Sequence, residues 1–130
     1  MMKIIIDGKV ATVSSGSVEN TNNVYSEEEV VVGTYFDKPH YRRVISVTSG
    51  NSNTITTLFD ASELNVDTLV YLGGVGIASG YECNIPMAFP EGTLAISYQR
   101  SNNTIVETHT TDLFNSIPLT IVFEYTKSTD

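Results

Sequence analysis

The chain has 130 residues, the length of one domain that buries about two-thirds of its unfolded surface on folding. Acidic residues outnumber basic ones by 15 to 7, for a formal net charge of −8. This balance argues against binding to nucleic acid and to anionic membranes, since both depend on Lys and Arg. We expect no membrane insertion and no signal peptide, because no apolar run is long enough for either.

The first part of the chain predicts a small hairpin and a linker. Two short apolar runs, residues 3–6 and 9–13, flank Asp7-Gly8, a dipeptide that favours a two-residue type I′ turn. Residues 14–23 are rich in Ser, Asn and Gly without periodicity, which is typical of a linker. The predicted organisation is a β-hairpin at 1–13, a polar linker at 14–23 and a globular domain at 24–130. The hairpin is either an assembly segment that packs on another subunit or a loose end.

The next stretch predicts a helix start and then two strands. Ser26 and Glu29 have the spacing of a helix capping box, and acidic residues at a helix start complement its dipole. The β-branched run at 30–32 is apolar on both faces, as in a strand that is covered on both sides or buried at a subunit interface. Asp37-Lys38-Pro39 predicts a tight turn before a second strand. Neighbouring arginines there point to opposite faces, and we expect one to pair with an acid. The candidate oligomer interface comprises Val30, Val31, Val32, Arg42 and Arg43.

The middle of the chain alternates between strand and turn signals. We expect a turn at 49–53, a short strand at 54–57, one helical turn at 60–65 and a strand at 66–72. The glycine-rich residues 73–80 lack the Lys-Ser/Thr ending of a phosphate-binding loop, and no helix pattern follows them. They predict a long mobile connection, the kind of segment in which surface recognition tends to lie.

The last third of the chain has the clearest β pattern. Apolar residues alternate with polar ones over 94–99 and again over 119–126, with a turn at 101–103 and a polar strand at 104–110. Short strands with frequent turns predict an all-β fold, an antiparallel β-sandwich.

Few side chains in the sequence point to catalysis, metal binding or ligand binding. His40 and His109 have no third ligand at a recognisable spacing, and we expect both to be partly exposed rather than to hold a metal. No nucleophile elbow or distinct carboxylate pair is present, so we predict a non-enzymatic protein without cofactors. Cys83 cannot form an internal disulfide, because it is the only cysteine, and we expect a small buried side chain. Tyrosines near turns could stack on sugars, or pack at the core edge instead. The candidate ligand-binding residues are Tyr71, Tyr81 and Tyr98.

Two segments carry a resemblance to a known family. The stretch from Tyr25-Ser26 through Gly33-Thr34 to Tyr41-Arg42, and the ending Tyr125-Thr126-Lys127-Ser128-Thr129-Asp130, resemble the C-terminal domain of bacteriophage and prophage tail proteins. The resemblance spans about residues 24–130, with both ends matched. The family usually has Trp and a turn glycine where this chain has Tyr35-Phe36-Asp37-Lys38. Without a glycine suited to positive φ, we expect a different type of hairpin here.

The resemblance implies a function and partners. Such a domain is a structural virion component of a tail fibre or baseplate tip, made in the bacterial cytoplasm. It would form a homotrimer, contact other tail proteins and attach to the host surface, where a glycan is one candidate receptor. Its loops at 49–53 and 73–80 would carry specificity. Two alternatives remain open: a monomeric carbohydrate-binding module with a shallow tyrosine groove, and a trimerisation domain without receptor binding.

Overall fold

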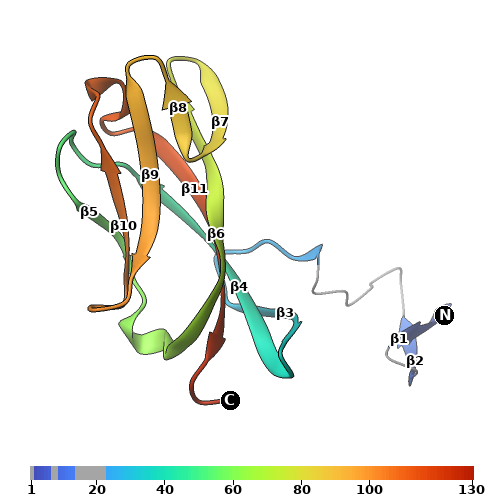
Figure 1. Ribbon diagram of the computed structural model, residues 1–130. Helices are drawn as coiled ribbons and strands as arrows, with labels where there is room; N and C mark the ends of the chain where they lie inside the picture. The colour runs from blue at the N-terminus through green and yellow to red at the C-terminus, as the bar shows by residue number, and fades with distance from the viewer. Residues whose placement is uncertain (1, 7–8, 14–22) are drawn as a thin grey trace.

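The computed structural model describes residues 2–6, 9–13 and 23–130, and the last of these ranges forms a β-sandwich (Figure 1). All strand pairs are antiparallel, which confirms the predicted fold class. The four-stranded sheet has the order β5 (Thr56–Asp60), β10 (Thr104–His109), β9 (Gly92–Gln99) and β8 (Met87–Phe89). The five-stranded sheet has the order β3 (Val30–Tyr35), β4 (Lys38–Thr48), β11 (Pro118–Lys127), β6 (Val66–Ala78) and β7 (Tyr81–Ile85).

The predicted N-terminal hairpin also has its two strands. β1 (Met2–Ile6) pairs with β2 (Lys9–Val13) in an antiparallel register. The predicted turn at Asp7-Gly8 and residues 14–22 of the predicted linker lie outside the described residues.

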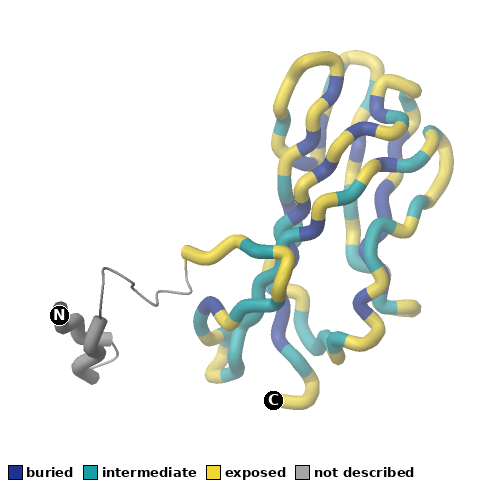
Figure 2. The backbone as a smooth tube through the Cα atoms, turned by 180° about the vertical axis from the view of Figure 1, so that it is seen from behind, coloured by how far each residue is buried: buried dark blue, intermediate teal, exposed yellow. Residues whose placement is uncertain are grey.

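The core lies between the two sheets and is filled mainly from β11. Its alternate residues Leu119, Ile121, Phe123 and Tyr125 are at most 2% exposed. The Phe123 ring meets two aromatic rings of the opposite sheet, Phe59 at 6.5 Å and Tyr98 at 5.8 Å between centroids. Figure 2 shows the buried residues following the strands while the connecting loops are exposed. The period-two pattern in the sequence therefore marks the inner face correctly.

No helix begins at Ser26, so the capping-box prediction is wrong. The Ser26 hydroxyl accepts from the N–H of Glu28 at 3.0 Å, as in a local turn. The Glu29 carboxylate instead accepts from Tyr125 Oη and from Lys127 Nζ, the latter at 2.6 Å. Its partners lie at the end of β11, far away in the sequence, and these tertiary contacts replace the local cap.

The β3–β4 connection is a tight two-residue turn. Tyr35 pairs with Lys38, and the intervening Phe36 and Asp37 have φ values of 48° and 65°. Positive φ at both central residues is the type I′ geometry, which the lack of glycine led us not to expect. The expectation that no residue here adopts a positive φ is therefore wrong. The turn also lies one residue earlier than the predicted Asp37-Lys38-Pro39, since Lys38 and Pro39 already belong to β4.

The glycine-rich segment is not a loop, which corrects the prediction for residues 73–80. β6 continues to Ala78, and only Ser79-Gly80 forms a turn before β7. Gly74 pairs with Ile121 on one side and with Ile85 on the other. A Cβ atom on Gly74 would lie 2.1 Å from the Thr120 carbonyl oxygen, so only glycine allows β6 to approach β11 this closely.

The smaller predicted elements are present with shifted bounds. The strand predicted at 54–57 is β5 at Thr56–Asp60. The helical turn predicted at 60–65 is a 3₁₀ turn, η2 (Ser62–Leu64), and it ends at Asn65, which has a left-handed conformation. A second 3₁₀ turn, η3 (Asp112–Phe114), lies between β10 and β11.

The Gly74 contact leads to a stability prediction. Gly74→Ala adds a methyl group against fixed backbone at a φ of +154°, so we expect the free energy of unfolding to fall by roughly 3 kcal/mol. Gly80→Ala is the matched control, because at a φ of +79° its Cβ atom meets nothing within 4 Å. It should cost roughly 1 kcal/mol. Urea unfolding of both variants measures the difference, and equal losses would contradict the close-approach argument.

Candidate functional site

Several connections gather at one end of the sandwich, which we call the loop end. It comprises residues 49–53, 79–80, 90–91 and 110–117, at the top of Figure 1. The register explains the gathering: Pro118 at the start of β11 pairs with Thr48 at the end of β4, and Leu119 pairs with Gly76 near the end of β6. The far end carries the β3–β4 turn, η2 and the β9–β10 turn.

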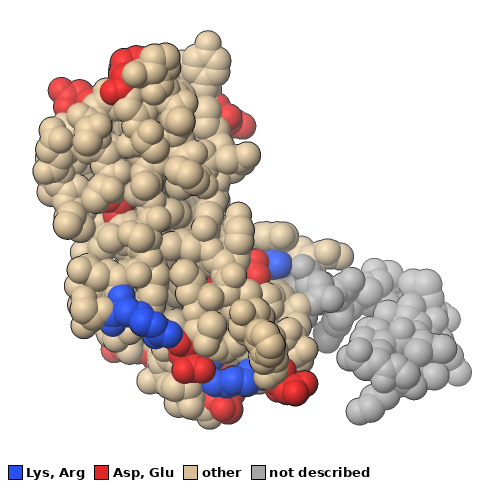
Figure 3. All heavy atoms as spheres, in the orientation of Figure 1, with Lys and Arg blue, Asp and Glu red and all other residues tan. Residues whose placement is uncertain are grey.

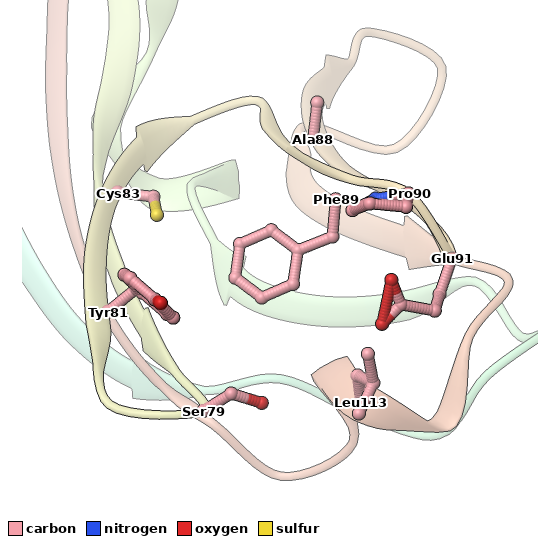
Figure 4. A pocket seen from close by; sticks show the side chains of 8 residues that line it. All are labelled: Ser79, Tyr81, Cys83, Ala88, Phe89, Pro90, Glu91 and Leu113. Atoms are coloured by element: carbon pink, nitrogen blue, oxygen red, sulfur yellow. The ribbon is translucent and has the colours of Figure 1, made fainter.

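A pocket of about 420 Å³ opens at the loop end, which is within the size range of small-molecule sites (Figure 4). Exposed Tyr81 stands at one side, with its ring at 84° and 6.1 Å from the half-buried Phe89 ring. Phe89 is in turn held by the buried Phe114 ring at 5.2 Å. The carboxylate of Glu91 lies across the pocket from Tyr81 (Figure 4). The lining residues are Ser79, Tyr81, Cys83, Ala88, Phe89, Pro90, Glu91 and Leu113.

The elements around the pocket explain why these side chains meet. The β6–β7 turn brings Tyr81 to the start of β7, and the chain then crosses to the other sheet through β8, which ends at Phe89. The tight connection between β8 and β9 places Glu91 at the pocket, and Leu113 of η3 completes the lining. Cys83 is half-buried and lines the pocket, which corrects the expectation of a fully buried side chain.

Charge is divided unevenly along the sandwich. The lysines and arginines within residues 23–130 lie on the half away from the loop end, and Figure 3 shows no basic residue on the upper half of the face it presents. The exposed acids at the loop end are Glu91 and Asp112, and the exposed Glu82 lies beside it near the start of β7. The pocket therefore lies in a region of negative charge. The basic residues concerned are Lys38, Arg42, Arg43, Arg100 and Lys127.

Beneath the loop end, β10 buries an ion pair. The side chains of Glu107 and His109 are both 0% exposed, and Glu107 Oε2 lies 2.5 Å from His109 Nδ1. The other Glu107 oxygen accepts from the N–H of Gly50 at 3.0 Å. The expectation that His109 is partly exposed is thus wrong. His109 and Glu107 share the inward side of β10 with the core residue Ile105, although the strand looked polar.

The hydrogen bonds of His109 favour its protonated form. Its Nε2 atom lies 2.7 Å from Asn115 Oδ1, and this oxygen also accepts from the N–H of Ser52 at 2.8 Å. Both ring nitrogens thus face oxygens, an arrangement that the doubly protonated imidazolium beside an ionised Glu107 satisfies with both of its N–H groups. Burial lowers the pKa of His109, but the bonds to Asn115 and Glu107 outweigh it, so that the pKa is raised above its ordinary value.

The predicted interface residues have different surroundings. Val31 is 46% exposed on the edge strand β3, whereas Val32 is buried at 6%. Arg42 pairs with Glu124 at 2.9 Å and stacks on the Tyr25 ring at 4.1 Å. The other residues are half-buried: Val30 pairs with Arg42 across the sheet, and Arg43 bonds the carbonyl of Glu27 at 3.2 Å.

The predicted tyrosines do not come together. Tyr71 is 51% exposed on the outer face of β6, and only Tyr81 lines the pocket. Tyr98 stacks on Phe123 in the core, and its hydroxyl donates to Asn103 Oδ1 at 2.9 Å. A single groove formed by all three is therefore not present. Sequence reasoning missed Glu91 and Phe89, although Pro90-Glu91-Gly92 has the composition of a turn.

Within residues 23–130 and the two hairpin strands, no group of His, Cys, Asp or Glu is arranged to hold a metal ion. No helix in that same part of the chain is long and apolar enough to cross a membrane. Comparison with family models, curated proteins and solved structures found no match to this chain.

The buried ion pair predicts how stability depends on pH. With its folded-state pKa raised above 6.5, His109 keeps its proton in the folded state where the unfolded state has released it. The stabilisation is therefore complete below the unfolded-state pKa and is lost as pH rises through the folded-state pKa. Urea unfolding between about pH 6 and pH 9 should show this decline. At the acidic end of this range, His109→Gln should lower the free energy of unfolding by about 3 kcal/mol. The variant should also lose the decline of this free energy with rising pH.

The other histidine provides the control. His40 contacts Glu124 at 2.7 Å on the outer side of the sheet, away from the buried pair. His40→Gln should leave most of the pH dependence in place. If instead the decline persists in His109→Gln and disappears in His40→Gln, the assignment to the buried pair is refuted.

Proposed function

We propose that this chain is a non-enzymatic structural component of a phage tail, at a fibre or baseplate tip. It assembles as a homotrimer in the bacterial cytoplasm, joins other tail proteins in the virion and uses the loop end to attach to the host surface. The resemblance of residues 25–42 and 125–130 to tail-protein C-terminal domains supports this proposal. The sandwich is consistent with a structural role of this kind.

A row of exposed apolar side chains on β6 is the observation that carries the assembly part of the proposal. Tyr71, Val75 and Ile77 are between 40% and 51% exposed. They occupy alternate positions of one strand, with Gly73 between Tyr71 and Val75, so they share the outer face of the five-stranded sheet. Soluble monomers seldom leave a continuous apolar surface of this kind in water, and a subunit contact would cover it.

The attachment part rests on the position of the loops. The outer face of β6 and the loop end are different surfaces, so contacts between subunits leave the loops accessible (Figure 1). Recognition sites commonly lie on loops held by a rigid scaffold. Of the three predicted ligand residues, Tyr81 is the one that lies beside the loop end. For the subunit contact, Val31 on edge strand β3 adds further exposed apolar area.

Absolute mass in solution tests the assembly. Light scattering after size exclusion should give about three times the 14.2 kDa chain mass, both for the full chain and for a variant starting at Val24. Loss of the trimer only in the shorter variant would move the contacts to the hairpin. A monomer in both would refute the proposal and favour the monomeric carbohydrate-binding module.

A charge on the apolar row tests where the subunits meet. Val75→Lys introduces a cation in the middle of the row and should shift the protein toward the monomer, since a buried unpaired charge costs several kcal/mol. Thr93→Lys is the matched control, because Thr93 is exposed on β9 in the other sheet. A trimer that tolerates Val75→Lys, or dissociates only with Thr93→Lys, would exclude β6 as the contact.

A further inference from the structure

We propose that the loop-end pocket beside Tyr81 and Glu91 binds an organic ammonium group. The ligand class is a positively charged nitrogen that carries an apolar body, such as a quaternary ammonium or an alkylammonium. This inference goes beyond the proposed function and does not depend on it, because the pocket belongs to a single chain.

The aromatic wall of the pocket suits such a cation. Tyr81 is 66% exposed, so most of its ring is accessible to a ligand. The perpendicular contact with Phe89 holds this ring in place, and Phe89 rests on the fully buried Phe114. A cation over an aromatic face is attracted by the negative potential of the ring, most strongly when water is partly excluded. Ala88, Pro90 and Leu113 supply the apolar surroundings.

Glu91 supplies the opposite charge. Its carboxylate faces the pocket across from Tyr81 (Figure 4). Among the described residues it forms no ion pair and no side-chain hydrogen bond, so it is available to a ligand. A carboxylate on one side and an aromatic ring on the other can enclose an ammonium group from two directions.

The charge around the pocket selects against other ligands. No lysine or arginine of residues 23–130 lies at the loop end, whereas Asp112 at the loop end and Glu82 beside it on β7 add negative charge. Anions are therefore repelled and cations are attracted. The buried His109 is already paired with Glu107, so it does not offset this field. A neutral sugar finds few partners, because the polar side chains of the lining are Ser79, Tyr81 and Glu91 together with the weakly polar Cys83.

Two probes of the same shape and different charge test the proposal. Choline and its neutral carbon analogue 3,3-dimethylbutan-1-ol are titrated into the full chain at constant ionic strength. Binding is followed by backbone NMR shifts and by protection of Cys83, the only cysteine, from an uncharged alkylating reagent. Choline should bind at least about tenfold more tightly than the alcohol, and n-butylammonium distinguishes a primary from a quaternary preference.

Single substitutions assign the binding to the pocket. Glu91→Gln and Tyr81→Ala should each weaken choline binding about tenfold, with the fold kept because both side chains are exposed. Phe36→Ala and Glu63→Gln change an exposed aromatic residue and an exposed acid outside the pocket and should have no effect. Equal affinity for the alcohol, no binding of either ammonium probe, or unchanged binding in Glu91→Gln would each overturn the proposal. A monomeric mass in solution would not affect it.

Discussion

Strand β11 is the element on which both sheets depend. It is hydrogen-bonded to β4 on one side and to β6 on the other, and its inner side chains fill the space between the sheets. Burying each large apolar side chain contributes about 1.5–3 kcal/mol, so this one strand supplies a large part of the stabilisation. The approach of β6 to β11 requires a residue without a side chain at Gly74. The position of the β6–β7 turn, and with it Tyr81, therefore follows from packing in the middle of the sheet.

Hydrogen-bonded charges then hold the two ends of the sandwich. At the loop end, the Glu107–His109 pair connects β10 to Gly50 and Asn115 in two different loops. A buried ion pair gains little net stability after desolvation, but its directional bonds define how the loops are arranged. At the far end, the hydrogen bond from the Tyr41 hydroxyl to the Asp130 carboxylate, together with burial, raises the pKa of Tyr41 to about 12.

The sequence predicts the parts of this structure that depend on local pattern. The strict alternation in β9 and β11 reveals both strands and their inner faces, because side chains alternate between the faces of a sheet. Gly74 was misread because glycine serves both flexible loops and close strand contacts, and only the neighbouring strand distinguishes them. His109 was misread because its partners Glu107 and Asn115 are polar too, and polarity alone does not reveal burial. Glu91 was missed because the pocket around it exists only once two sheets and η3 meet.

The surfaces left by this architecture are suited to different interactions. The apolar row of β6 faces outward from the middle of the five-stranded sheet, while the pocket opens at the end of the sandwich. Association along the row would bury apolar area, which is a non-directional interaction that tolerates salt. Binding at the pocket would rely on charge and aromatic contact, which weaken as salt screens them. Since Val75 and Glu91 lie on different surfaces, the chain can assemble through one without closing the other. High salt would then release a charged ligand while leaving the assembly intact.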